Sequence, residues 1–296
     1  LPCADHFPAS KVSWPVHPGR AVLLIHDMQD YFLAFYGVGS PLVATLIRKV
    51  RALRDWARQW NIPVVYTAQP AKQSPADRAL LNDVWGPGLT AADPALQTVA
   101  ALVAPEAGDT VLVKWRYSAF QRSSLEGLMK QWGRDQLLIC GIYAHIGCLT
   151  TALDAFMRDI QPFMVADAVA DFSEADHQMA LKYVAGRCGR VIGVDELTVI
   201  QPVVPTLAWL EAQVLARLPD PEEALEPDEN LMDYGLDSMQ IMSLVAEWRR
   251  LGLQISFEDL ARTPSLNGWW AVLSSVAAPA AVSLAPDYQR GSMPVR

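Results

Sequence analysis

The side chains best suited to chemistry in this sequence stand at the ends of short apolar runs. Asp27 directly follows the run AVLLIH, and Lys114 lies near the end of the run TVLVKW. Further polar or flexible positions follow two other runs and comprise Gln69, Arg78, Tyr143, His145 and Gly147. An acid, a cation and several hydrogen-bonding groups at successive strand ends would suit a small anionic substrate. Taken singly, each has an ordinary structural interpretation, such as a helix cap for Asp27 or a surface position for Lys114.

The elements that must position these side chains alternate between strands and helices. Apolar, β-rich runs lie at 21–26, 62–67, 110–115, 136–141, 162–167 and 190–194, and amphipathic helical patterns between them include 41–60, 125–132 and 150–160. Continuous apolar runs that alternate with helices indicate a parallel sheet covered on both faces. We therefore predict an α/β three-layer sandwich with a mostly parallel sheet, in which ligands bind at the carboxyl ends of the strands.

The charge of the chain changes after this first part. Residues 1–206 carry 18 Lys and Arg against 19 Asp and Glu, whereas residues 207–276 carry 4 against 12. A change of this kind suggests two domains with different partners. We predict a first domain over 1–200, a linker over 201–206, a small four-helix domain over 207–276, and a tail over 277–296 whose Ala, Pro and Ser content favours disorder.

Composition argues against several other classes of protein. No apolar run reaches the roughly 18 residues that a membrane-spanning helix needs. The net charge is −8 with no basic run, which argues against nucleic acid as a partner. Four cysteines without CxxC spacing, and a start that lacks the signal-peptide pattern, favour a reduced cytoplasmic compartment. No group of histidines and carboxylates stands at metal-ligand spacing, so we expect no metal.

Six blocks within residues 10–200 resemble the isochorismatases of catechol siderophore synthesis, in the cysteine-hydrolase (nicotinamidase-like) superfamily. The blocks are LLIHDMQDYF, VVYTAQP, DRALLNDVWGPGL, VKWRYSAF, GIYAHIGCLTTALDAFMRDIQPF and ADAVADFS. The resemblance implies that Asp27 and Lys114 are catalytic. It also implies a set of substrate-binding residues, which are Phe32, Gln69, Arg78, Trp85, Tyr143 and Gly147.

The resemblance also bears on Cys148, which stands in a turn typical of nucleophiles. Amidohydrolases of the superfamily carry an Asp–Lys–Cys triad, but block matching puts Gly147 at the cysteine's position and Cys148 one residue later. Isochorismatases hydrolyse a vinyl ether, which requires a proton on carbon rather than attack on a carbonyl. Asp27 is then the expected general acid, and this role requires a raised pKa that a neighbouring Lys114 would oppose.

A second motif, YGLDSMQIM at 234–242, resembles the attachment site of acyl and peptidyl carrier proteins. The resemblance implies that Ser238 bears a 4′-phosphopantetheine arm. The alternative is an ordinary Asp/Ser helix N-cap. Apolar residues near the arm are expected to contact partners, and these are Met239, Met242, Phe257 and Ala261, although Phe257 could equally pack into the small core.

Together the two motifs identify the chain as a member of the bifunctional isochorismatase–aryl carrier proteins of enterobactin- and vibriobactin-type pathways. The partners implied are isochorismate, a phosphopantetheinyl transferase, a 2,3-dihydroxybenzoate–AMP ligase and a condensation domain of a nonribosomal peptide synthetase. We also expect a homodimer through the first domain. Two alternatives stay open: a nicotinamidase-type cysteine amidohydrolase that uses Cys148, and a carrier domain on an inactive hydrolase scaffold.

Overall fold

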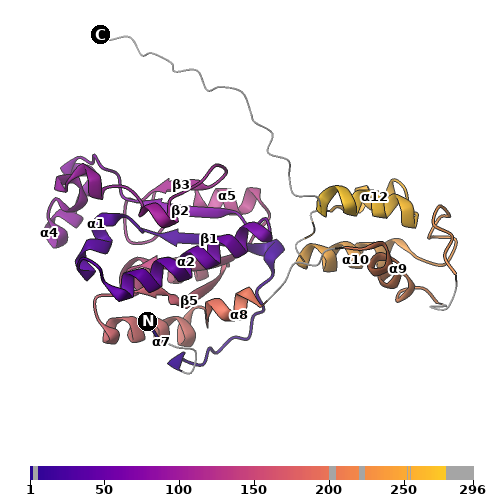
Figure 1. Ribbon diagram of the computed structural model, residues 1–296, viewed down its shortest axis with the longest axis horizontal. Coiled ribbons are helices and arrows are strands. Elements are labelled where there is room, and N and C mark those ends of the chain that lie inside the picture. The colour runs from indigo at the N-terminus through magenta and orange to yellow at the C-terminus, as the bar shows by residue number, and fades with distance from the viewer. Residues whose placement is uncertain (3–5, 200–204, 220–223, 252, 254, 278–296) are drawn as a thin grey trace, which may run out of the picture. The chain divides into compact units, whose positions relative to one another are not determined.

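The computed structural model describes residues 1–2, 6–199, 205–219, 224–251, 253 and 255–277, which fold as two compact units (Figure 1). The first unit is built on Leu1–Pro202, and the second on Val203–Arg249 together with Leu253–Arg296. Most of the predicted linker over 201–206 lies outside the described residues. The predicted disordered tail also lies outside them from residue 278 onward.

A single parallel sheet forms the centre of the first unit, as the sequence predicts. Its strands are β1 (Ala21–His26), β2 (Val64–Ala68), β3 (Thr110–Val113), β4 (Gln136–Ile142), β5 (Gln161–Ala170) and β6 (Arg190–Ile192). They lie in the order β3-β2-β1-β4-β5-β6, and every strand pairing in the sheet is parallel. The predicted runs match these strands to within a few residues, so the α/β prediction is confirmed.

Helices cover both faces of the sheet and complete three layers (Figure 1). One face packs against α2 (Pro41–Gln59) and α8 (Val194–Thr198), and the other against α5 (Leu125–Gln131), α6 (Leu149–Phe156) and α7 (Glu174–Arg187). Three short helices follow β1 and β2 along the chain: α1 (Asp30–Leu33), α3 (Pro75–Arg78) and α4 (Leu81–Trp85). The predicted helix at 150–160 is shorter than expected, and a π-helical turn, Ala144–Cys148, precedes it.

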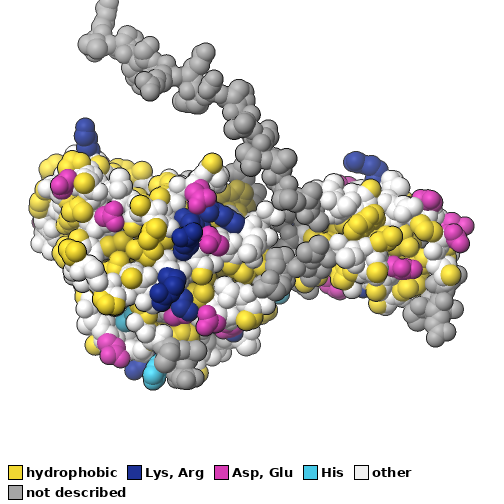
Figure 2. Space-filling view, in the orientation of Figure 1, with side chains coloured by type: hydrophobic (Ala, Val, Ile, Leu, Met, Phe, Trp, Pro, Cys, Tyr) yellow, Lys and Arg dark blue, Asp and Glu magenta, His cyan; other side chains and the backbone are white. Residues whose placement is uncertain are grey.

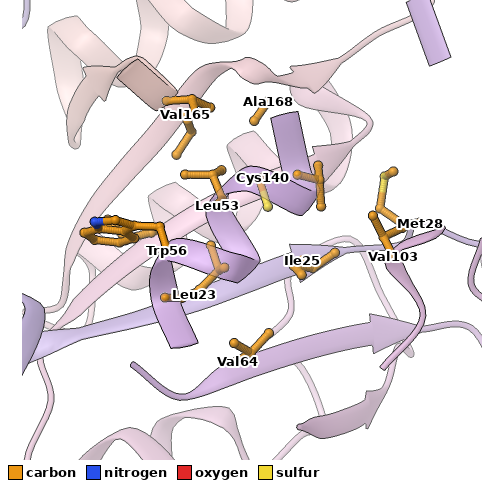
Figure 3. Close-up of a cluster of buried hydrophobic side chains, with 14 of the residues drawn as sticks. Leu23, Ile25, Met28, Leu53, Trp56, Val64, Val103, Cys140, Val165 and Ala168 are labelled. Atoms are coloured by element: carbon orange, nitrogen blue, oxygen red, sulfur yellow. The ribbon is translucent and has the colours of Figure 1, made fainter. Parts of the chain in front are cut away.

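The core beneath α2 shows why these residues form a buried parallel sheet. All six residues of β1 are buried, because both of its faces are covered. Leu23 and Ile25 of β1 meet Leu53 and Trp56 of α2, with Cys140 of β4 in the same cluster (Figure 3). Each such side chain contributes about 1.5–3 kcal/mol when fully buried. The rigid strands that result hold the residues at their carboxyl ends in fixed places.

Four helices make up the described part of the second unit. They are α9 (Leu207–Leu215), α10 (Ser238–Arg250), α11 (Phe257–Ala261) and α12 (Leu266–Ala277). Trp248 and Trp269 meet edge to face at 6.0 Å in the core, and the indole Nε1 of Trp269 donates to the carbonyl of Leu260 at 2.9 Å. The four-helix prediction is therefore confirmed. None of the helices described in either unit is long and apolar enough to cross a membrane.

The entry into β1 depends on a buried cation, Arg134, just before β4. Its guanidinium donates to the carbonyls of Pro18 and Ala21, each at 2.7 Å, and to that of Asn61 at 3.2 Å. These bonds tie the start of β1 to the loop before β4. They therefore connect the segments from which the two central strands begin.

Replacing this guanidinium is expected to destabilise the first unit. Arg134→Met should lower its free energy of unfolding by about 2–4 kcal/mol, because buried carbonyls lose charged donors. Urea unfolding followed by circular dichroism measures the change, with Arg187→Met on the exposed end of α7 as the matched control. A loss for Arg134→Met within about 0.5 kcal/mol of the control would contradict the proposed tie.

Candidate functional site

The strand order places a cavity at the point where the sheet changes direction. Chain connections run from β1 outward to β3 on one side and from β4 outward to β6 on the other, and ligands bind at such switch points in open α/β sheets. A cavity of about 330 Å³ opens there. Its lining includes every residue predicted for catalysis or substrate binding, namely Asp27, Phe32, Gln69, Arg78, Trp85, Lys114, Tyr143 and Gly147.

Asp27 lies at the centre of the polar wall, immediately after β1. One carboxylate oxygen accepts from the ammonium of Lys114 at 2.8 Å, and the other accepts from the hydroxyl of Thr67 at 2.6 Å. Asp27 and Lys114 are only 6% and 5% exposed. The backbone of Asp27 has a φ of 49°, a left-handed conformation that aspartate tolerates better than most residues. The sequence predicted the two charged residues but not Thr67, which bonds to the same carboxylate.

The electrostatics of this cluster favour an ionised Asp27 in the unliganded protein. Burial raises the pKa of Asp27, but the neighbouring His26 and Lys114 and the hydrogen bonds from Lys114 and Thr67 outweigh it. The net result is a pKa below the ordinary value for aspartate. The sequence left open the contest between desolvation and Lys114. In the folded protein the effects of His26 and Lys114, with the hydrogen bonds to the carboxylate, prevail over desolvation.

A second cation, Arg78, stands in the cavity wall with donor capacity to spare. The side chain is 4% exposed, and its Nε donates to the carbonyl of Gly86 at 2.7 Å. One terminal nitrogen, Nη1, is buried without a hydrogen-bond partner among the described residues. Gly88 makes room for this group, since a Cβ at that position would lie 2.4 Å from Nη2. A buried guanidinium with an unused donor is suited to bind a carboxylate.

Gln69 is held through its backbone, which leaves its side-chain amide for a ligand. Its N–H donates to the side chain of Gln29 at 2.7 Å, and the Gln29 amide donates back to the Gln69 carbonyl at 3.1 Å. Within the described residues no hydrogen bond engages the amide group of Gln69. Gln29, which the sequence did not single out, is thus the residue that fixes this loop.

Aromatic side chains form the remaining walls. The hydroxyl of Tyr143 donates to the carbonyl of Phe32 at 2.8 Å, and its ring stacks on Phe172 at 4.1 Å. The indole Nε1 of Trp85 donates to the hydroxyl of Tyr117 at 2.8 Å. Phe172 and Tyr117 were not predicted. Both come from loops, and their contribution depends on tertiary contacts that no local pattern encodes.

Cys148 does not belong to the cavity. It is fully buried among side chains of the core between the sheet and α6, and Gly147 rather than Cys148 lines the cavity. Burial raises the pKa of the Cys148 thiol well above its ordinary value. A neutral, enclosed thiol is a poor nucleophile. The geometry therefore disfavours the amidohydrolase alternative.

His145, the other polar residue after β4, is engaged in structure and is not part of the cavity lining. Its backbone N–H and its ring Nδ1 both lie 2.6 Å from the carboxylate of Asp171. With Asp176 these residues form a group whose potential metal-ligating atoms lie within 4.8 Å of one another, a grouping that the sequence did not predict. The backbone N–H of Phe172 also donates to Asp171, so this carboxylate already accepts three bonds and supports the turn after β4.

Ser238 occupies the first position of α10 with a free hydroxyl. The capping role belongs to its neighbour Asp237, whose carboxylate accepts from the backbone N–H of Gln240 at 2.7 Å, while the Gln240 side chain accepts from the Asp237 N–H at 2.7 Å. Ser238 is exposed, and no hydrogen bond within the described residues engages its hydroxyl. The N-cap alternative therefore applies to Asp237 and leaves Ser238 available for modification. A helix N-terminus tolerates the phosphate that such an arm brings.

The four predicted partner-contact residues are all exposed. Met239 and Met242 are 76% and 56% exposed on α10, and Phe257 is 36% exposed at the start of α11, beside an exposed Ala261 at its end. Figure 2 shows hydrophobic side chains across the visible face of this unit, with Asp and Glu around them. Met232, 41% exposed, adds a further apolar side chain that the sequence did not single out.

These observations define the class of protein: an α/β enzyme domain with a small-molecule cavity, joined to a helical domain with a free serine at a helix start. Two family models match the same two parts, the isochorismatase domain over residues 21–196 and the phosphopantetheine attachment site over residues 208–273. The chain belongs to the isochorismatase family, and its second unit is a domain for covalently attached phosphopantetheine.

Similarity extends over nearly the whole chain. It is 55% identical to "Enterobactin synthase component B" of Escherichia coli (strain K12) over 93% of this chain and 95% of that protein. It is 46% identical to "Isochorismatase" of Bacillus subtilis (strain 168) over 93% of each chain. Among solved structures, a cysteine hydrolase from Pseudomonas syringae pv. phaseolicola 1448A shares the fold, with a TM-score of 0.57 and 23% identity over 65% of this chain and 96% of that one.

The burial of Cys148 leads to a direct chemical expectation. In the native protein, iodoacetamide at pH 8 should leave Cys148 unmodified, because its thiol is enclosed and protonated. After unfolding in urea the same residue should react fully, which serves as the internal control. Peptide mapping by mass spectrometry measures both states. Rapid, selective alkylation of Cys148 in the folded protein would restore the cysteine-hydrolase alternative.

Proposed function

We propose that the first unit hydrolyses the vinyl ether of isochorismate to pyruvate and 2,3-dihydro-2,3-dihydroxybenzoate. The observation that carries this proposal is the buried Asp27–Lys114 pair in a cavity whose described lining holds no cysteine. The site offers a proton donor, cations and an enclosed space, but no thiol to attack an acyl group. The high identity to proteins named isochorismatase and enterobactin synthase component B supports the same reaction.

The reaction needs one group that moves a proton and others that hold the substrate. Asp27, once protonated, gives its proton to the terminal methylene carbon of the enolpyruvyl group, and an oxocarbenium ion forms. Water adds to the cationic carbon and loses a proton. In the resulting hemiketal, the bond between the former vinyl carbon and the ether oxygen breaks. The hydroxyl group loses its proton and becomes the carbonyl of pyruvate, and the ether oxygen, which stays on the carbocyclic ring, takes up a proton. Arg78 and Lys114 bind the two substrate carboxylates, and the aromatic walls exclude bulk water from the cation.

Substrate binding favours the protonation of Asp27 that the surrounding side chains oppose. His26 and Lys114, together with the hydrogen bonds from Lys114 and Thr67, hold the pKa of Asp27 below its ordinary value. A substrate carboxylate beside Lys114 offsets that positive charge and adds a negative one close to Asp27. Both changes raise the pKa of Asp27. Asp27 is thus protonated when the substrate is bound.

Asp27→Asn should nearly abolish pyruvate release while the protein stays folded. The expected loss in kcat is about 100- to 10,000-fold or more, the usual contribution of a general acid. Asp159→Asn, at an exposed position that also has a positive φ of 59°, is the matched control and should retain activity. Coupled detection of pyruvate measures both variants. Near-normal turnover by Asp27→Asn would contradict the mechanism.

The lowered pKa of Asp27 also fixes the direction of the pH dependence. The free enzyme holds less of the protonated acid as the pH rises above that pKa, so kcat/KM should fall about tenfold per pH unit between pH 5 and 8. The profile of kcat, which reports the loaded complex, should be flatter because bound substrate raises the pKa. Steady-state kinetics across this range measures both profiles. A kcat/KM that is constant over the range would show that Asp27 does not take its proton from solvent in the free enzyme.

In the second unit, we propose that Ser238 is the attachment site of 4′-phosphopantetheine and that the arm carries 2,3-dihydroxybenzoate. The arm supplies a thiol that forms a thioester with the acid. The exposed Met239, Met242, Phe257 and Ala261 contact three partners in turn: a phosphopantetheinyl transferase, a 2,3-dihydroxybenzoate–AMP ligase and a condensation domain of a nonribosomal peptide synthetase. Flexible methionine side chains suit a surface that several partners share.

We also propose that the first unit pairs with a second copy. The edge strand β3 supports this, because Val111 and Val113 are 51% and 46% exposed on it, and exposed apolar edges favour association. The cytoplasmic location inferred from the cysteines stays a prediction. So do the domain limits inferred from charge and composition.

Ser238→Ala should block loading and leave hydrolysis intact. Wild-type protein treated with coenzyme A and a phosphopantetheinyl transferase should gain the mass of one arm, whereas Ser238→Ala should gain none. Ser243→Ala, an exposed serine on the same helix, is the matched control and should be loaded normally. Intact-protein mass spectrometry and the pyruvate assay give the two readouts. A mass gain by Ser238→Ala would place the arm elsewhere, and a large loss of its hydrolysis would show that the two activities are coupled.

A further inference from the structure

His26, the last residue of β1, is a buried side chain of the cavity wall that the mechanism above does not use. Its ring is 0% exposed, and its Nδ1 lies 2.7 Å from the carbonyl oxygen of Ile142 and 3.7 Å from a carboxylate oxygen of Asp27. Because a carbonyl oxygen only accepts hydrogen bonds, Nδ1 carries the proton in the neutral ring. The imidazole thus joins the ends of the two central strands beside the proposed acid.

The ring is uncharged at neutral pH. Burial, which Lys114 reinforces, lowers the pKa of His26 to about 4 against the opposing effect of Asp27. The backbones of Ile142 and Tyr117 favour the charged form but do not outweigh burial. A charged imidazole would depress the pKa of Asp27 further and hinder its protonation. The lowering of the Asp27 pKa that His26 causes requires a charged ring, so the neutral ring leaves Lys114 and the hydrogen bonds as the groups that oppose protonation.

Gly147 lies so close to His26 that a side chain at position 147 would require the imidazole ring to move. A Cβ on Gly147 would lie 2.1 Å from Cε1 and 2.7 Å from Nε2 of the ring. The ring is held by the hydrogen bond of its Nδ1 to the Ile142 carbonyl at 2.7 Å, which it would lose on moving away. The imidazole therefore takes the volume that a nucleophile on this turn would need.

Packing alone does not account for an imidazole here. Its Nε2 is buried and makes no hydrogen bond of normal geometry within the described part of the chain, although the Tyr117 backbone is placed to favour the charged ring. An unsatisfied buried polar atom costs about 1–3 kcal/mol. Valine or isoleucine, which are common in buried parallel strands, would avoid that cost.

We propose that His26 is a positioning residue which, paired with Gly147, confines this site to acid-catalysed hydrolysis without a nucleophile. The neutral ring fills the place of the absent side chain and keeps Asp27 aligned with Lys114 and the substrate. This proposal rests on the proposed function of the first unit. It explains why position 147 is a glycine. It also assigns a role to His26, which is neither the proposed acid nor one of the substrate-binding cations.

The first test measures whether the two positions are coupled in stability. Gly147→Cys should lower the urea midpoint strongly or prevent folding, and adding His26→Val should recover most of that loss. Gly127→Cys, on α5 with no atom within 4 Å of its new Cβ, is the matched control and should have a small effect. The proposed contact between His26 and Gly147 is wrong if the urea midpoint of the double variant equals the sum of the two single changes or lies below it. It is also wrong if the double variant does not fold.

The second test uses the thiol introduced at position 147 and needs no substrate. In the protein that carries both His26→Val and Gly147→Cys, the introduced thiol should react with iodoacetamide in the native state, since positions 147 and 26 both line the cavity. The native Cys148 should stay unmodified in the same sample, and peptide mapping distinguishes the two sulfurs. If the introduced thiol is as unreactive as that of Cys148, the His26 ring does not fill the volume that a nucleophilic side chain at position 147 would need.

The third test addresses positioning through kinetics. His26→Val should lower kcat by about 100-fold, the scale of a small misplacement of a catalytic group, with KM changed less. His26→Asn keeps a donor for the Ile142 carbonyl and should recover about tenfold or more of that loss. Equal kcat for His26→Val and wild type, or no rescue by asparagine, would overturn the positioning role. If wild type releases no pyruvate from isochorismate, the proposed function fails, and the first two tests still decide the pairing.

Discussion

The site depends on one buried ion pair that spans three strands. Asp27 follows β1 and Lys114 follows β3, with β2 between them, and Thr67 of β2 completes the cluster. Ladder bonds hold both charges in register: the Asp27 N–H donates to the Thr67 carbonyl at 3.2 Å, and the Lys114 N–H to that of Ala68 at 2.8 Å. A buried pair is costly unless its geometry is good. The pairing of β1, β2 and β3 therefore positions the two charged side chains for this contact.

Around that pair the cavity has two poles with different tasks. The cationic pole, which includes Lys114 and Arg78, suits the carboxylates of a substrate, and the aromatic pole encloses its ring. The reversal of strand order between β1 and β4 lets loops from both halves of the sheet reach the same space. Loop residues supply the shape of the cavity, and strand ends supply its charges.

The sequence predicts the parts of this structure that depend on local pattern. Apolar runs predicted the six strands, and the charged residues at their ends proved to line one cavity. His26, Thr67 and Phe172 could not be found this way. Each has the pattern of an ordinary strand or loop residue, and its place in the site follows from which strand neighbours which. The direction of the pKa shift of Asp27 could not be predicted from the sequence either. It depends on whether neighbouring groups lie within hydrogen-bonding distance of the carboxylate.

The enclosed cysteines have a consequence for the second unit. Cys140, Cys148 and Cys188, which are the cysteines of the described residues, are all buried, and burial raises the pKa of each thiol. An acyl thioester is transferred readily to any accessible thiolate. The second unit would hold its acid as a thioester on the arm. The described cysteines of the first unit are buried, so their thiols do not compete for that acid. Within the described residues, no exposed cysteine is therefore available to take an acyl group from the arm by trans-thioesterification.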